Sequence, residues 1–266
     1  MAATVAVWSL AGWGLTIRWS GRVRDKVPSS YRGVRRSTQP LGLMSDAAAP
    51  SLESVWEHRE ERVFPALFGP VTRGVFPLDA ELFTQAFKQS SIDPRWLHYG
   101  ILEFAPTERR SSWLYATSGF SNPWEQEPSE FASSQVSGFG SELVLEAPSQ
   151  GDWAVRALKQ LLAYNILLAH GRLGDFEPLR HGARVPLGGP INGESDSEIR
   201  FVAIAKPIHF EATFHLDSGQ VDLLQVIGIT AQERDWAKEH GTAELVAMLT
   251  ERNAFPVTDP SRRSVA

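Results

Sequence analysis

The chain has 266 residues, of which 42% are hydrophobic, 21% charged and 10% aromatic, a composition typical of a folded protein with a sizeable core. It contains no cysteine, which excludes disulfides, thiolate metal sites, iron–sulfur clusters and cysteine nucleophiles and suits a reducing, cytoplasmic setting. The formal net charge is −5, but residues 1–43 hold seven basic side chains and one acidic one, so the rest of the chain carries −11. An acidic domain repels phosphate backbones, so we expect no nucleic acid ligand, and a basic protein is a plausible partner.

The N-terminal segment differs from the rest of the chain. Residues 5–19 are largely apolar but are interrupted by Arg18 and are fewer than the roughly 20 apolar residues that a membrane-spanning helix needs. A signal peptide has positive residues before its apolar run, and none precedes this stretch. A transit peptide at the N-terminus, or a true start of the protein at Met44, would also explain the composition of this segment. We expect residues 1–48 to be a disordered or non-native leader, residues 49–266 to form a single domain, and no membrane association.

The first expected element is a helix that begins at Ser51 as N-cap and ends near Pro65 and Gly69. One side of this helix is apolar, and the other is expected to face solvent because it carries Glu57, Arg59, Glu60 and Glu61. Apolar residues at helical spacing predict a second, short helix over residues 79–88.

After residue 88 the spacing of apolar residues changes from that of helices to that of strands. Residues 97–104 and 112–116 are short aromatic and aliphatic runs bounded by Pro or Gly, and residues 142–147 form a third such run. A long loop over residues 120–139 separates the second and third strands, and loops of this length are often functional. A helix from Asp152, taken as N-cap, to Gly171 is apolar nearly all round in its second half, which predicts that it lies across a sheet.

After a turn-rich region over residues 171–197, three more strands are expected at residues 199–205, 210–216 and 221–229. Thr230 and Glu233 form a capping box that begins a helix, Gly241 ends it, and Thr242 begins another. The order of elements predicts an α+β fold with a mixed, largely antiparallel sheet covered by helices in a single domain.

Most catalytic signatures are missing from the sequence. The chain contains no GxxxxGK[ST] phosphate loop, no GxGxxG dinucleotide fingerprint, no GxSxG nucleophile elbow and no HExxH zinc helix. Residues 138–141, GFGS, resemble a glycine-rich anion loop only superficially, because they lead into a strand, and a tight turn is the expected structure. We therefore predict no cofactor.

Residues of the expected strands offer two candidate sites, one for a metal ion and one for catalysis. His209, Glu211, His215 and Asp217 share one face of an expected strand, but the two histidines would be about 20 Å apart, so we expect a solvated strand face and no metal. Glu103, Glu142, Glu146 and Asp222, with His181, could serve a hydrolytic enzyme if burial perturbed their pKa values. This enzyme is the alternative hypothesis. The main hypothesis, a protein-binding domain, assigns no catalytic residue.

Five segments in order resemble the bacterial branch of the suppressor of fused family. They are WLYATSGFSNP (residues 113–123), SGFGSELVLE (137–146), LKQLLAY (158–164), the long stretch 221–249 and VTDPSRRSV (257–265). His181-Gly182 followed by VPLGGP is similar to a further turn of the family, with the order of His and Gly reversed. The resemblance covers residues 55–265.

The resemblance implies a non-enzymatic protein-binding domain of the suppressor of fused type. For the bacterial branch it implies an immunity protein that neutralises a polymorphic toxin, or otherwise sequesters a protein partner, and a basic toxin domain would suit the acidic charge. An exposed sheet edge could accept a peptide strand, and Phe120 and Trp124 are either aromatic anchors or part of the core. The candidate partner-binding residues are Ser118, Gly119, Phe120, Ser121, Asn122, Trp124, Glu142 and His181.

Overall fold

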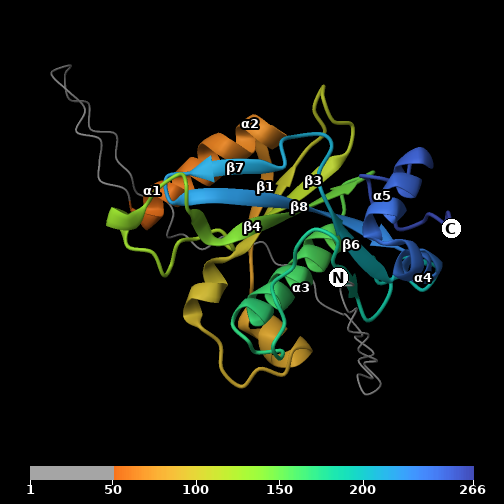
Figure 1. The fold of residues 1–266 in the computed structure, drawn as a ribbon, viewed down its shortest axis with the longest axis horizontal. Coiled ribbons are helices and arrows are strands. Elements are labelled where there is room, and N and C mark those ends of the chain that lie inside the picture. Colours follow the sequence, from red (N-terminus) through yellow and green to blue (C-terminus); the bar gives the residue numbers. More distant parts are fainter. Residues whose placement is uncertain (1–50) are drawn as a thin grey trace. The chain divides into compact units, whose positions relative to one another are not determined.

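One eight-stranded sheet organises the part of the chain that the structure describes. The structure is a computed structural model and describes residues 51–266 (Figure 1), so the leader predicted for residues 1–48 lies outside the described residues. The strands are β1 (Val71–Pro77), β2 (Gly100–Phe104), β3 (Trp113–Ser118), β4 (Val136–Ala147), β5 (Arg184–Pro186), β6 (Phe201–Ala205), β7 (Thr213–Leu216) and β8 (Gly219–Ile229).

The strand order in the sheet is β1-β2-β3-β4-β8-β6-β5. Neighbouring strands are antiparallel except for β4 and β8, which run parallel with Leu143 opposite Leu224. β7 pairs antiparallel with the first residues of β8. The predicted α+β fold with a mixed, largely antiparallel sheet is confirmed.

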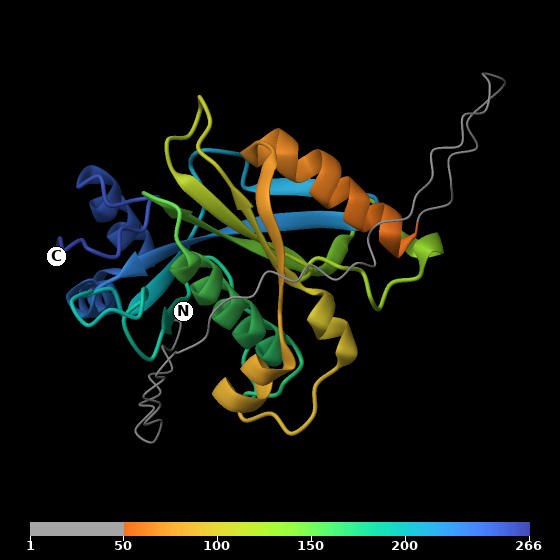
Figure 2. The same cartoon turned by 180° about the vertical axis from the view of Figure 1, so that it is seen from behind.

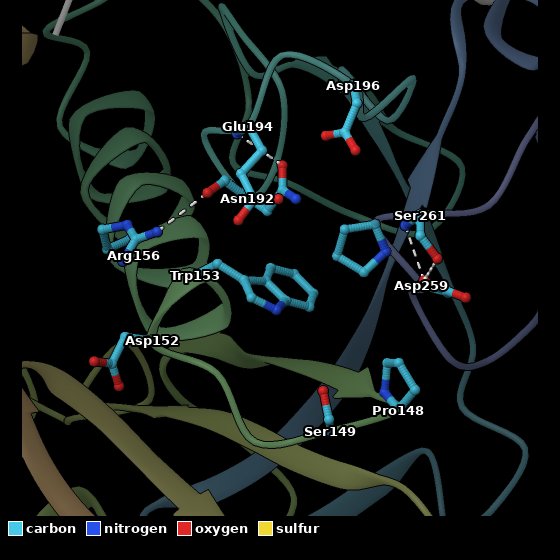
Figure 3. A pocket seen from close by; sticks show the side chains of 11 residues that line it. Pro148, Ser149, Asp152, Trp153, Arg156, Asn192, Glu194, Asp196, Asp259 and Ser261 are labelled. Carbon is cyan, nitrogen blue, oxygen red and sulfur yellow. Dashed lines mark hydrogen bonds between the residues drawn. The ribbon is translucent and has the colours of Figure 1, made fainter. Parts of the chain in front are cut away.

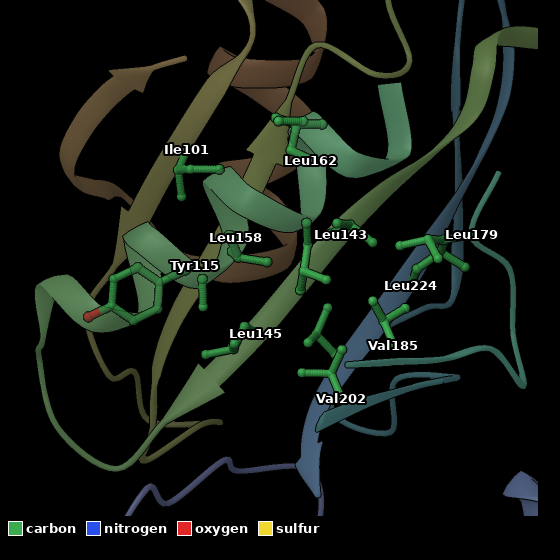
Figure 4. Packing of buried hydrophobic residues seen from close by; sticks show 14 of the residues in the cluster. Ile101, Tyr115, Leu143, Leu145, Leu158, Leu162, Leu179, Val185, Val202 and Leu224 are labelled. Atoms are coloured by element: carbon green, nitrogen blue, oxygen red, sulfur yellow. The ribbon is translucent and has the colours of Figure 1, made fainter. Parts of the chain in front are cut away.

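Helix α3 (Asp152–Ala169) covers one face of the sheet. Most of its residues are buried, because its apolar side chains surround nearly the whole helix. Leu158 and Leu162 pack in one cluster with the sheet residues and with Leu179 (Figure 4). Alternate strand residues face it, among them Ile101, Leu143 and Leu224.

The alternate strand residues that point away from α3 pack under two other helical segments. Figure 2 shows these segments, orange and blue, apart from the green helix α3. The first is a continuous helical run of α1 (Leu52–Glu57), the π-helix η2 (His58–Val63) and α2 (Phe64–Phe68), whose Phe64 and Phe68 contact Phe104 on β2. The second is α4 (Ala231–His240) with α5 (Thr242–Glu251), which pack on β6 and β8. The sheet is therefore covered by helices on both faces.

Short helical turns complete the described structure: η3 (Leu82–Ala86), η4 (Pro94–His98) and η5 (Pro128–Glu130). Within residues 51–266, none of the helices combines the length and the apolar character that crossing a membrane would demand.

Local signals placed several boundaries correctly. Ser51 caps α1, the Thr230–Glu233 capping box begins α4, and Gly241 separates α4 from α5. The helical run ends at Phe68 with Gly69 as its C-cap, as predicted. Pro65 does not end it, because this residue lies at the start of α2, directly after the π-helical turn η2. The N-cap of α3 is Gly151, one residue before the predicted Asp152.

Several predicted strand limits were wrong: β3, β6 and β8 differ from the prediction by one or two residues at an end, and three differences are larger or have a visible cause. Residues 97 and 98 belong to the turn η4, because Asp93 accepts a hydrogen bond from the Arg95 amide at 2.9 Å and caps that turn. Residues 210–212 precede β7, because the Phe210 ring packs edge-on against Phe68 at 4.9 Å between centroids. β4 begins at Val136, inside the segment predicted as a loop. The exposed strand β1 and the three-residue β5 were not predicted.

Candidate functional site

The Glu142 carboxylate is fully buried on β4 and is bound by the end of β3 and the turn that follows it. It accepts hydrogen bonds from the Thr117 hydroxyl (2.5 Å), the Gly119 amide (2.9 Å), and the amide (3.0 Å) and hydroxyl (2.7 Å) of Ser121. A buried carboxylate is costly unless it is hydrogen-bonded, so these four donors offset its desolvation. The carboxylate therefore fixes the backbone of residues 117–121.

Arg59 supplies the opposite charge from η2, on the helical run that covers this face of the sheet. Its side chain is 1% exposed, and its Nη1 lies 3.8 Å from Glu142 Oε1. The same nitrogen donates to Ser121 Oγ (3.0 Å) and to Asn122 Oδ1 (2.6 Å). Arg59 thus binds the turn and the carboxylate together.

Glu60 adds a further link between the helix and the turn. Its Oε1 accepts hydrogen bonds from Arg59 Nη2 (3.2 Å) and from the Ser118 hydroxyl (2.5 Å). We call the whole set the Arg59–Glu142 clamp: Arg59, Glu60, Thr117, Ser118, Gly119, Ser121, Asn122 and Glu142. Its charges lie near the buried Tyr99, whose pKa is raised by burial and, to a lesser extent, by the Glu142 charge.

The sequence interpretation of Arg59 as a solvent-facing residue was wrong. Val55, Arg59, Phe64 and Phe68 are all buried, with spacings of four, five and four residues. The five-residue step spans the wide π-helical turn of η2, which keeps Arg59 on the buried side. Its position four residues after Val55 was the one sequence signal that could have placed Arg59 there.

Gly119 allows the turn to approach the neighbouring strand closely. Its φ is +135°, a conformation that L side chains rarely adopt, and a Cβ at this position would lie 2.6 Å from the Tyr99 ring. The position therefore requires glycine for conformation and for space.

Phe120 and Trp124 flank the clamp residues Ser121 and Asn122 in the sequence and pack against different aromatic partners. Phe120 is 1% exposed and stacks on Phe139 with ring centroids 4.7 Å apart, so it belongs mainly to the core. Trp124 is half-buried, meets Trp56 edge-on at 5.7 Å and lies under the Arg95 guanidinium. We call the accessible residues here the aromatic face, which comprises Arg95, Trp124, Glu125, Phe139 and His170 and surrounds a pocket of about 20 Å³.

The structure brings seven of the eight candidate partner-binding residues into the clamp or against it, and leaves His181 apart. His181 lies in the turn before β5, the last strand in the sheet order, with β6 and β8 between it and β4. Partial burial lowers the pKa of its imidazole. Six of the seven residues (Ser118, Gly119, Phe120, Ser121, Asn122 and Glu142) are buried, so any role in partner binding requires them to act by holding the aromatic face in place.

The other strand carboxylates have separate partners. Arg73 binds Glu103 through two hydrogen bonds, of 2.8 and 2.6 Å, and Asp222 accepts one from Thr213 at 2.9 Å. Glu146 Oε2 accepts one hydrogen bond from the Ser112 hydroxyl and pairs with His209 Nδ1 at 3.0 Å, whereas its buried Oε1 has no partner. Each carboxylate is thus engaged within the chain and none is paired with another carboxylate in these contacts.

The expected strand of His209, Glu211, His215 and Asp217 is divided, because only His215 lies in β7. His209 pairs with Glu146, whereas Asp217 lies 3.8 Å from His58. Across residues 51–266, no group of three or more metal-ligating side chains of the His, Cys, Asp and Glu types is gathered in one place.

A pocket of about 400 Å³ lies elsewhere, at the N-terminal end of α3 (Figure 3). It is lined by Pro148, Ser149, Asp152, Trp153, Arg156, Asn192, Glu194, Asp196, Asp259, Pro260 and Ser261. Glu142 and His181 line neither this pocket nor the one beneath the aromatic face.

Comparison with known proteins gives a family match and several structural matches. The model of the suppressor of fused protein family matches residues 95–263. No curated protein matches the chain. The structure in the Sufu–Fu complex has a TM-score of 0.55 and 16% identity, covering 82% of this chain and 93% of that one.

Two further solved structures have a lower similarity. Drosophila suppressor of fused has a TM-score of 0.49 and 17% identity over 62% of this chain. The match spans 42% of the Drosophila protein's length. A suppressor of fused homolog from Neisseria gonorrhoeae has a TM-score of 0.46 and 18% identity, covering 63% of this chain and 78% of that one.

Replacing Arg59 by methionine should destabilise the fold strongly. The substitution leaves the Glu142 charge buried without its counter-charge, which typically lowers the free energy of unfolding by about 3–5 kcal/mol. Urea unfolding followed by circular dichroism measures this loss. Arg62→Met is the matched control, because Arg62 is exposed on the same helix and its loss should change stability by less than about 0.5 kcal/mol. Equal unfolding midpoints for the two variants would contradict the clamp.

Gly119→Ala and Gly182→Ala separate the effect of close packing from that of backbone conformation. Both glycines have positive φ, but a Cβ at Gly182 would meet no atom within 4 Å. We expect Gly119→Ala to lose about 1–3 kcal/mol more unfolding free energy than Gly182→Ala, because only the first substitution overpacks the core against Tyr99. If Gly182→Ala is equally destabilised in the same unfolding experiment, the packing argument fails.

Proposed function

Because the chain belongs to the suppressor of fused family, we propose that it acts by binding a protein partner and not by catalysing a reaction. The family match over residues 95–263 carries the proposal. A related structure was determined as a complex of Sufu with Fu, which is a protein–protein complex of that relative.

The bonding of the strand carboxylates supports a binding function. Glu103, Glu142 and Glu146 are fully buried, and each is held by hydrogen bonds from its own chain. A catalytic carboxylate must reach a bound substrate, and neither described pocket includes one of these three. We therefore do not extend the proposal to the hydrolytic alternative.

We assign partner contact to the aromatic face. Trp124 and Phe139 are accessible aromatic side chains, a residue type that dominates protein interfaces, and Phe139 is 37% exposed. The clamp holds the backbone of residues 117–122, and the amides of Phe139 and Trp124 donate to carbonyl oxygens of this turn, so the face is ordered before a partner arrives. Preorganisation of this kind lowers the entropy cost of association.

The finer assignment is an immunity protein of the bacterial type that neutralises a toxin. The acidic charge of the chain beyond residue 43, which is −11, supports a basic partner such as a nucleic-acid-degrading toxin domain. Complementary charge accelerates the encounter and fixes orientation.

Affinity purification of the full chain from its native host tests the binding function. We expect one protein to co-purify in stoichiometric amount, identified by mass spectrometry, and the immunity assignment expects its sequence to be basic. An acidic partner would contradict the immunity assignment alone. Failure to recover any protein under gentle conditions would contradict the binding function itself.

Trp124→Ala should reduce the amount of recovered partner about tenfold or more, as is typical for an aromatic hot-spot residue. Trp236→Ala is the matched control, because Trp236 is a half-buried tryptophan on α4 that stacks on His240 at 4.1 Å, away from the aromatic face. Equal recovery with both variants would show that partner contact lies elsewhere.

A further inference from the structure

The pocket at the N-terminal end of α3 combines an apolar base with acidic walls. The side chain of Trp153, the second residue of α3, extends across its centre, and Figure 3 shows the indole lying between α3 and the segment of Asp259 and Ser261. Pro148 and Pro260 also line it. The indole is half-buried, so one part packs against the chain and the rest is open to the pocket.

Four carboxylates and one guanidinium line this pocket. Asp152 lies 3.1 Å from Arg73, and Asp259 accepts hydrogen bonds from the amide (2.9 Å) and hydroxyl (2.7 Å) of Ser261. Within residues 51–266, the side chains of Glu194 and Asp196 have no hydrogen bond or ion pair. Two exposed carboxylates without an ion-pair partner therefore line the same pocket as an accessible indole.

The one guanidinium in the wall, that of Arg156, forms no ion pair with Glu194 or Asp196. Arg156 Nη2 donates to the carbonyl oxygen of Asn192 at 3.3 Å, and Figure 3 shows it on α3, on the far side of the indole from Asp259. The wall carboxylates Glu194, Asp196 and Asp259 come from two loops separated by more than 60 residues in the sequence, which the fold brings to one opening.

We propose that this pocket binds an arginine side chain of the protein partner, with the guanidinium stacked on the Trp153 indole and paired with Glu194 and Asp196. This inference rests on the proposed function, because it names the chemistry of one contact with the partner. Arginine fits better than lysine, since a planar guanidinium stacks on an aromatic ring and binds carboxylates through a fork of N–H donors. A volume of about 400 Å³ accommodates such a side chain.

The test uses the full chain and the capped tripeptide acetyl-Gly-Arg-Gly-amide as the probe. Binding is followed by NMR through the indole N–H signal of Trp153, which is assigned by its absence in Trp153→Phe. We expect a dissociation constant on the order of 1 mM, typical of one exposed cation–π contact with ion pairs. The citrulline tripeptide, which has the same shape without the charge, should bind about tenfold more weakly.

Glu194→Gln with Asp196→Asn should raise the dissociation constant about tenfold. The control double variant is Glu239→Gln with Glu251→Gln, which removes the same charge from exposed positions on α4 and α5, outside the pocket lining. Its dissociation constant for the probe should stay within about twofold of the value for the unchanged chain. The inference is overturned if the probe shifts no signal of Trp153, if the citrulline peptide binds equally, or if both double variants weaken binding equally.

The two experiments distinguish a failure of the arginine-pocket inference from a failure of the proposed binding function. If a partner co-purifies but the arginine probe does not bind, the pocket assignment falls and the binding function stands. If the probe binds as expected but no partner is recovered, the pocket stands as an arginine site and the binding function falls.

Discussion

A single buried carboxylate organises the region around the predicted site. Glu142 is inaccessible to solvent and would be strongly destabilising there without partners, so the fold supplies four hydrogen bonds from residues 117–121 and the guanidinium of Arg59. These donors come from β3, from the turn after it and from a helix more than 50 residues earlier in the chain. The interaction therefore couples the sheet, the turn and the covering helix into one unit.

This coupling suits a protein that binds rather than reacts. Most polar groups of the clamp bond to one another, although Arg59 Nε is buried without a partner. Phe120 of the turn stacks on Phe139, and the Trp124 amide donates to the carbonyl oxygen of Asn122. In the proposed function, the buried residues would support the accessible aromatic side chains, and these side chains would contact the partner. The acidic pocket at Trp153 would provide a second, separate contact for the same partner.

The sequence predicted what depends on local chemistry. The Ser51 cap, the Thr230–Glu233 capping box and the apolar helix α3 were all recognised, because their signals lie within a few residues. The candidate set of eight residues included Ser118, Gly119, Ser121, Asn122 and Glu142, and the structure places these five in one network. Phe120 and Trp124 pack against the network, and His181 lies apart from it. Sequence spacing alone could not reveal that this network is internal.

The features that the sequence did not predict depend on packing between residues far apart in the chain. Arg59 was placed on the solvent side because its partners Ser121 and Asn122 are more than 60 residues away, and a π-helical turn alters the spacing that reveals a buried side. β1 was missed because most of its residues are exposed and lack an apolar alternation. Strand β7 begins late because Phe68 and Glu146 hold Phe210 and His209, which no local pattern indicates.

Amide hydrogen exchange of the full chain tests the central claim most directly. If Glu142 holds the turn as part of the folded core, the amides of Gly119 and Ser121, which donate to its carboxylate, should exchange as slowly as those of the adjoining strands β3 and β4. Exchange of these two amides at the fast rate of exposed loops, while β3 and β4 remain protected, would contradict the account.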